Sequence, residues 1–335
     1  NTCFWTLRPT VQFGTRPVAH ATDIGASASY LTFGREPVGV FGKNRSAGRG
    51  VYMSSLGCFG VNRSRLHLTL TARSDLTYDS AYHHKLRGCI WQLLEDTSYW
   101  AEHDQQKPLG ITYTNPIPWG DAKEGDKKTL TISATREPVL AEIAKAVQAN
   151  PEFNIGQMPF RVTDLTQSTA DVGEPGTTGT IETNTGVYVA FDPEEADEYG
   201  ITPDGDDEHF WRDSDPLTAF SQKIEDNLQT KWELLDLETQ FGGPCELKGP
   251  VFNSYQLMKT FWTPLTVTAE ETRTTCLSKW TFNYTVRSEA HREVLNTALA
   301  AGIGERNGLG LGSLEITTQT PPGRQPAKDT QSAHQ

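Results

Sequence analysis

Apolar and polar residues alternate along Leu66–Ala72, the pattern of a half-buried β-strand. The period then becomes helical, because the apolar residues of Tyr82–Leu94 fall on one face of a helix. The same reading predicts strands at 111–114, 129–133 and 158–162 and a second helix at Glu137–Ala149. The order strand, helix, strand, strand, helix, strand is that of a ferredoxin-like βαββαβ unit.

The second half of the chain repeats this order more loosely. Aromatic and β-branched residues dominate its predicted strands, and apolar residues at helical spacing mark its two helices. The predicted strands are 186–191, 250–263, 274–287 and 312–317, and the predicted helices are 216–237 and 288–301. The expected fold class is therefore α+β, with tandem ferredoxin-like (βαββαβ) domains.

Composition divides the chain further. Residues 1–52 carry six basic side chains against two acidic ones, and Met53 is the first methionine. We expect this opening segment to be disordered or non-native, with a basic RNA-binding arm as the alternative. The expected parts are an appendage (1–62), a first domain (63–165), a linker and functional loop (166–185), a second domain (186–317) with a solvated acidic insertion (192–215) and a glycine-rich loop (302–312), and a disordered tail (318–335).

Charge and cysteine content suggest the cellular setting. The 335 residues carry a formal net charge of −12, with abundant Asp, Glu and Thr, as in proteins of salt-loving cytoplasms. In molar salt the Debye length is about 3 Å, so an acidic total charge does not exclude an RNA partner. The five cysteines form no Cys-x-x-Cys pair, and no apolar run has the length of a membrane span. We expect a cytoplasmic protein with no metal site and no membrane contact.

The segment Gly302–Gly312 contains five glycines around a single arginine, Arg306. Bare backbone amides beside a guanidinium suit an anionic ligand such as a phosphate backbone. The segment follows a helix and precedes a strand, the reverse of a dinucleotide-binding loop, and it lacks the Gly-Lys-Ser/Thr of a P-loop. A flexible hairpin without a ligand is the alternative.

Tandem ferredoxin-like units with such a loop before the last strand resemble the repeat-associated RNA-binding superfamily of CRISPR systems. The chain is most similar to the Cas-six type endoribonucleases, haloarchaeal members above all. Their loop pattern, Gly-h-Gly, five residues with a basic one, then Gly-h-Gly, where h is apolar, is matched throughout 302–312. A second match runs through Tyr82–Trp91, His103, Lys107 and Leu109–Tyr113, so the resemblance covers about residues 65–317.

The resemblance implies roles for particular residues. His103 would be the general acid or base, and Lys107 would stabilise charge on the phosphate. Trp91 stands where some members carry a tyrosine, and an indole cannot exchange protons as a phenol can. The expected RNA contacts are the loop residues Gly302, Gly304, Arg306, Gly308, Gly310 and Gly312, with Lys85, Arg87, Thr177 and Thr178.

Several of these residues have plainer explanations. Lys85 and Arg87 also fit a solvated helix face, and Thr177 and Thr178 also fit an ordinary turn. His83 and its neighbour His84 do not suit one metal ion, because adjacent helical residues face about 100° apart. We expect them to pack or to face RNA.

The implied activity is metal-independent cleavage of CRISPR precursor RNA within its repeats, producing guide RNAs. The 2′-hydroxyl attacks the adjacent phosphate and leaves a 2′,3′-cyclic phosphate, with no cofactor. The implied partners are the repeat RNA and a multi-subunit interference complex, with no DNA bound directly. Two alternatives stay open: a non-catalytic RNA-binding subunit of such a complex, and a small-molecule sensor or metal-dependent enzyme, for which the sequence offers no convincing ligand cluster.

Overall fold

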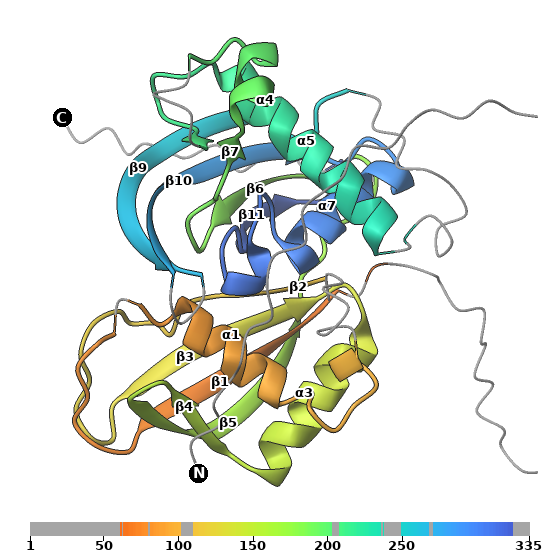
Figure 1. Cartoon of the computed structure of the whole chain (residues 1–335). Coiled ribbons are helices and arrows are strands. Elements are labelled where there is room, and N and C mark those ends of the chain that lie inside the picture. The colour runs from red at the N-terminus through yellow and green to blue at the C-terminus, as the bar shows by residue number, and fades with distance from the viewer. Residues whose placement is uncertain are drawn as a thin grey trace, which may run out of the picture. The chain divides into compact units, whose positions relative to one another are not determined.

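Two antiparallel sheets, each with helices packed against one face, make up most of the folded chain (Figure 1). The computed structural model describes residues 61, 63–79, 81–101, 110–202, 208–235, 237, 249–267 and 271–323. Val61 is the one residue of the predicted appendage among these, and the predicted tail lies outside them beyond residue 323.

The first sheet has the strand order β2-β3-β1-β5-β4. Without β4, this is the order expected of a βαββαβ unit. In β1, Leu66, Leu68 and Leu70 point into the core, as their alternation predicts. The hairpin strand β4 is absent from the sequence-based prediction. The elements are β1 (Ser64–Ala72), α1 (His83–Gln92), β2 (Ile111–Tyr113), β3 (Lys127–Ala134), α3 (Glu137–Ala149), β4 (Glu152–Ile155) and β5 (Met158–Thr169).

The second sheet repeats the ferredoxin-like order as β11-β6-β10-β9. Its helices α5 and α7 pack their apolar faces against a core that includes the stacked rings of Phe220 and Trp280, 4.2 Å apart. Three short elements, β7, α4 and β8, are inserted between β6 and α5. The elements are β6 (Thr178–Thr183), β7 (Ala190–Phe191), α4 (Pro193–Glu198), β8 (His209–Phe210), α5 (Leu217–Leu234), β9 (Ser254–Thr266), β10 (Thr272–Thr285), α7 (Glu289–Ala301), η1 (Asn307–Leu309) and β11 (Leu314–Thr320).

The structure corrects the prediction for the first strand of this second unit. That strand is β6, inside the segment 166–185 that was expected to be a linker, and β5 extends into the same segment. Residues 187–191 are buried one after another and pair only at isolated bridges and in the short β7. Only Ile181 gives β6 a large apolar side chain, so its Thr- and Gly-rich sequence resembles a loop.

Two further expectations change. The acidic segment 192–215 is not simply a solvated insertion, since Ala196, Ile201 and Trp211 are part of the hydrophobic core. Residues 203–207 of it lie outside the described part of the chain. The expected tail begins too early, because β11 continues to Thr320.

Contacts between the halves involve α7 and the start of β1. The Val61 N–H donates to Glu293 at 3.0 Å, and the Arg63 guanidinium lies 2.7 Å from the same carboxylate and 2.8 Å from Asp171. Arg65 donates to the Leu299 carbonyl at 3.2 Å. These contacts fix α7 against the first sheet, and the glycine-rich loop begins where α7 ends.

Candidate active site

The glycine-rich loop, residues 302–312, is folded back on itself. The Ile303 N–H donates to the Gly312 carbonyl at 3.0 Å, and the buried Asn307 amide donates to the carbonyls of Ile303 and Leu311. Gly312 has a φ of 67°, and a Cβ there would lie 1.9 Å from the Ile303 oxygen. A Cβ on Gly310 would lie 2.6 Å from the Tyr113 ring. These glycines are therefore required by close packing.

Most backbone amides of the loop are not available to a ligand, which corrects the expectation of a bare row. The Glu305 N–H donates to Tyr188, and the Gly312 N–H donates to Gly186, each at 2.9 Å. Within the described part of the chain, five amides of the loop have no acceptor, those of Gly304, Arg306, Asn307, Gly308 and Leu311, and three of them are consecutive at the η1 turn. The amides that donate to backbone carbonyls are those of 302, 303, 305, 309, 310 and 312.

Arg306 is the one non-glycine residue with a positive φ, 54°, among the residues described. Its guanidinium carbon lies 5.0 Å from the centre of the Tyr188 ring, a cation–π contact. The Tyr188 hydroxyl donates to Glu208 at 2.8 Å, and burial raises the pKa of Tyr188 to about 12. Arg306 forms no ion pair with any described carboxylate, so its charge can serve an anionic ligand.

A cleft of about 740 Å³ lies beside the loop. Arg87 and Trp91 of α1 line one wall, β2 lines another, and residues 304–308 line a third. Trp91 is half-buried and meets Trp100 edge to face, with 6.4 Å between the ring centres. The exposed Arg87 has no ion-pair partner in the described ranges. We call this space the loop cleft.

Lys231 of α5 also lines the loop cleft, and the sequence pattern did not single it out. Its ammonium donates to the carbonyls of Gly302 at 2.8 Å and Gly304 at 3.0 Å. Burial lowers the pKa of Lys231 to about 7, and the nearby Glu305 carboxylate opposes that shift. Burial raises the pKa of Glu305. The sequence did contain a signal for Lys231, because this charged residue follows Ile224 and Leu228 on the apolar stripe of the helix.

The structure brings Arg87, Trp91 and Arg306 to one cleft but leaves other predicted contacts elsewhere. Lys85 pairs with Asp79, and its stem packs against Gly156. Thr177 is buried, and Thr178 pairs with Thr320 at the far end of β6 from the loop. His103 and Lys107 lie outside the described residues, in a segment that rejoins the described chain at Gly110, which lines the loop cleft.

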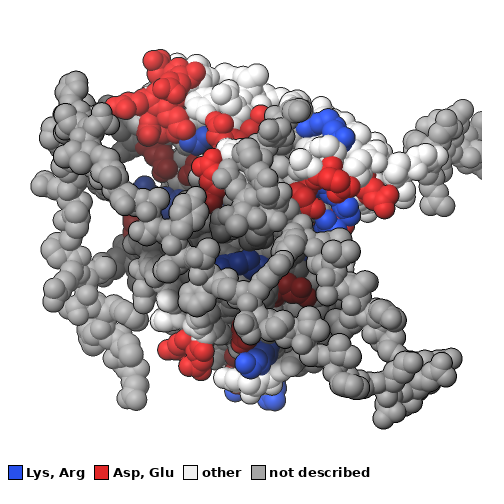
Figure 2. Space-filling model, turned by 90° about the vertical axis from the view of Figure 1, so that its right-hand side faces the viewer, with Lys and Arg blue, Asp and Glu red and all other residues white. Residues whose placement is uncertain are grey.

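Charged side chains are unevenly distributed over one face of the protein (Figure 2). On the face drawn in Figure 2, acidic side chains gather at the upper end, whereas basic side chains stand in small separate groups. Among the described residues, no group of three or more His, Cys, Asp and Glu side chains is placed to hold a metal ion. No described helix has both the length and the apolar character needed to cross a membrane.

Two ferredoxin-like units, with two arginines on a cleft beside the folded glycine-rich loop, define the class of tandem ferredoxin-like proteins. Residues 177–316 match the family model described as CRISPR associated protein Cas6, C-terminal. The CRISPR-associated endoribonuclease Cas6 of Haloferax mediterranei is 48% identical over 259 residues, 77% of this chain and 96% of that protein. The chain belongs to the Cas6 family of CRISPR-associated endoribonucleases.

More distant relatives agree with this assignment. A second Cas6 endoribonuclease, from Methanocaldococcus jannaschii, is 26% identical over 169 residues, 50% of this chain and 64% of that protein. A solved CRISPR-associated Cas6 structure superposes with a TM-score of 0.56 at 14% identity, over 77% of this chain and 100% of that one. A Cas6-related protein from Pyrococcus furiosus gives 0.56 at 18% identity, over 76% and 98%. The predicted family, fold and enzyme class are confirmed.

Proposed function

We propose that this protein cuts CRISPR precursor RNA within its repeats, in the loop cleft, and so produces guide RNAs in the cytoplasm. One observation carries the location of the site. Arg87 and residues 306–308 line the same cleft, and the amides of residues 306–308 have no acceptor among the described residues. Guanidinium groups and backbone N–H groups are the donors that proteins use most for phosphate oxygens.

The reaction is a transesterification that needs no metal. The 2′-hydroxyl before the cut loses its proton and attacks the adjacent phosphate. The 5′-oxygen of the next nucleotide leaves and takes up a proton, so the products are a 2′,3′-cyclic phosphate and a 5′-hydroxyl. One group must accept a proton and another must donate one, while cations stabilise the crowded phosphorane.

We assign one proton transfer to His103, because a histidine with an ordinary pKa of about 6.5 can fill either role at neutral pH. The resemblance implies this role for His103, and the role is supported by the chain position of its segment, which rejoins the described chain at Gly110 in the wall of the loop cleft. Lys107, Arg87 and Arg306 would stabilise the added negative charge. Trp91 would contact the RNA by stacking or by its indole N–H and would not transfer a proton.

Lys231 has a supporting role in this proposal. Its hydrogen bonds hold the carbonyls of Gly302 and Gly304 toward α5. Because Lys231 occupies these two carbonyls, they do not compete for the ligand. The groups of the loop that remain for a ligand in the cleft are then the amide donors of residues 306–308. Lys231 is thus a positioning residue of the loop.

The test uses repeat RNA transcribed from the source genome, in molar KCl and EDTA. We expect one cut per repeat, with a cyclic phosphate at the new 3′ end. His103→Ala should lower the cleavage rate by about 10²- to 10⁴-fold and leave RNA affinity nearly unchanged. The matched control is His84→Ala, which removes another histidine of the same half that lines neither cleft.

Other outcomes would change the assignment. A 3′-hydroxyl product or a requirement for a divalent metal would contradict the chemistry. Tight binding of repeat RNA without any cut would favour a non-catalytic RNA-binding subunit. Retention of the cut RNA by the protein would support our further expectation that the product passes to an interference complex.

A further inference from the structure

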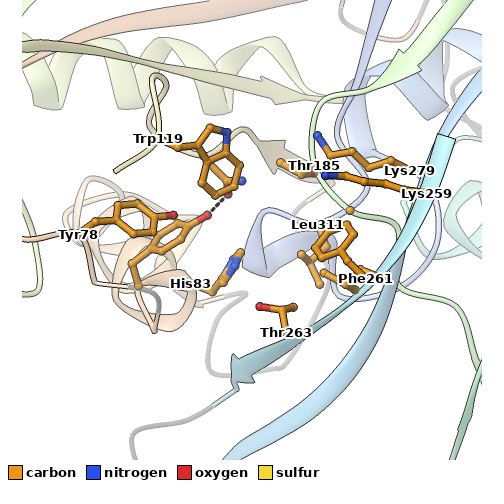
Figure 3. A pocket seen from close by; sticks show the side chains of 13 residues that line it. Tyr78, His83, Trp119, Thr185, Lys259, Phe261, Thr263, Lys279 and Leu311 are labelled. Atoms are coloured by element: carbon orange, nitrogen blue, oxygen red, sulfur yellow. Dashed lines mark hydrogen bonds between the residues drawn. The ribbon is translucent and has the colours of Figure 1, made fainter. Parts of the chain in front are cut away.

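A second cleft, of about 410 Å³, meets the glycine-rich loop at Leu311, whereas the loop cleft meets it at residues 304–308. Figure 3 shows His83, Tyr78 and Trp119 on one side of this space and the side chains of the β9–β10 hairpin on the other. The residues come from segments far apart in the sequence. We call this space the hairpin cleft.

Aromatic rings dominate the hairpin cleft. Trp119 is 53% exposed, although an indole of this size is usually covered in a protein without a ligand. Its ring meets Tyr78 edge to face, with the centres 6.0 Å apart, and this contact holds it at the mouth of the cleft. Phe261 of β9 faces the same space from the hairpin (Figure 3). A planar ligand between these walls would cover the exposed indole.

The buried polar side chains of the cleft offer one hydrogen-bond acceptor and one hydrogen-bond donor. His83 Nδ1 lies 3.0 Å from the Leu309 carbonyl, which can only accept, so Nδ1 carries the proton. Burial lowers the pKa of His83, and the neutral ring leaves Nε2 as an acceptor with no partner among the described residues. The buried Asn115 accepts from the Tyr82 hydroxyl through its carbonyl oxygen, which leaves its NH₂ group as a donor. A donor and an acceptor that line one cleft match the edge of a nucleobase, which carries both kinds of group.

Two lysines stand at the hairpin wall. Lys259 and Lys279 are direct partners in the β9–β10 ladder, and like charges in such a pair destabilise a sheet. Lys279 donates to the Asn184 carbonyl at 3.1 Å, and the Lys259 ammonium lies 5.3 Å from the Phe261 ring centre. Neither lysine has a carboxylate partner within the described residues. An anion between the two ammonium groups would relieve their repulsion.

We propose that the hairpin cleft binds one unpaired nucleotide of the RNA, away from the bond that is cut. Its base stacks between Trp119 and Phe261 with its edge toward His83 and Asn115, and its phosphate lies between Lys259 and Lys279. This inference rests on the proposed function, because it takes RNA to be the ligand of the protein. It adds a site that reads a single base, separate from the site of cleavage.

The test compares repeat RNA binding by Trp119→Ala and Trp262→Ala in molar KCl. Trp262 is an equally exposed tryptophan, at 54%, but it follows Phe261 on the strand and points to the opposite face. Loss of a stacked base should weaken RNA binding by Trp119→Ala by about 5- to 150-fold, while Trp262→Ala binds as the wild type does. Lys259→Ala should also bind more weakly, and melting temperatures confirm that each variant is folded.

Equal RNA affinity of both tryptophan variants would overturn the proposal. Free nucleoside 5′-monophosphates are the second arm, and we expect them not to compete with RNA at a large molar excess. Trp119-dependent competition by a monophosphate at low concentration would reassign the cleft to a free nucleotide and overturn the RNA assignment. Failure of the proposed function is distinguishable, since the wild type would then bind repeat RNA through Trp119 without cutting it.

Discussion

The glycine-rich loop allows a paired test of what its glycines do. Gly312→Ala places a methyl group 1.9 Å from the Ile303 carbonyl oxygen, at a φ of 67°. Gly308→Ala meets nothing within 4 Å and has no positive φ. The first change should therefore act on the fold of the loop, and the second should act only on what binds there.

Two contributions add up to the loss of stability expected for Gly312→Ala. Holding alanine in the left-handed region costs about 1–2 kcal/mol. Displacing the Ile303 carbonyl disturbs the Ile303–Gly312 hydrogen bond and that of Asn307, at about 0.5–1.5 kcal/mol each. The total is about 2–5 kcal/mol, or a melting temperature lower by roughly 4–20 °C. Gly308→Ala should stay within about 0.5 kcal/mol of the wild type.

The assay is thermal unfolding followed by circular dichroism in molar KCl, with RNA affinity measured on the same samples. Gly308→Ala should keep its melting temperature and bind RNA more weakly, because its methyl group stands beside the amides that face the loop cleft. Equal melting temperatures for Gly312→Ala and the wild type would refute the close packing of the loop. Equal destabilisation by both variants would mean that the loop needs its glycines for backbone flexibility and not for close packing.

Three further predictions concern charge and the chain's start. Arg306→Ala should lose about 10- to 150-fold in RNA affinity with its melting temperature kept, and unchanged affinity would remove Arg306 from the site. The pKa of Lys231 is about 7 in the folded protein and 10.5 ordinarily. As the pH rises, the folded state therefore loses the Lys231 proton at a lower pH than the unfolded state does. Stability should then rise by about 1.4 kcal/mol per unit between roughly pH 7 and 9, relative to Lys231→Met, in denaturant unfolding. Parallel stability curves for the two proteins would contradict that pKa. Deleting residues 1–52 should leave the melting temperature unchanged, whereas deletion through Arg63 should lower it, because Arg63 and the Val61 N–H both bind Glu293.

Local patterns predict much of this fold because they reflect burial directly. The helix at Glu137–Ala149 has the bounds expected from its sequence, where a proline near its start and a regular apolar face coincide. The long β9–β10 hairpin follows from its aromatic and β-branched residues. By contrast, β6 is stabilised by pairing with strands on both sides, and its own residues carry little apolar signal.

The sequence predicts the kind of site, a glycine-rich loop with an arginine, but not which groups of the loop are available to a ligand. The spacing of glycines and Arg306 indicates the loop, but not which amides remain available. That depends on acceptors such as Tyr188 and Gly186, which precede the loop by more than a hundred residues. Lys231 and the hairpin cleft likewise depend on contacts between distant segments, which periodicity cannot reveal.

The central claim is that the phosphate to be cut lies in the loop cleft, between α1 and residues 306–308. The most direct measurement is photo-crosslinking of repeat RNA that carries a photoreactive nucleotide beside the cut, bound to His103→Ala and mapped by mass spectrometry. We predict crosslinks to peptides that contain Arg306–Gly308 or the α1 residues Arg87 and Trp91. Crosslinks confined to other surfaces, such as the hairpin around Lys259, would contradict the claim.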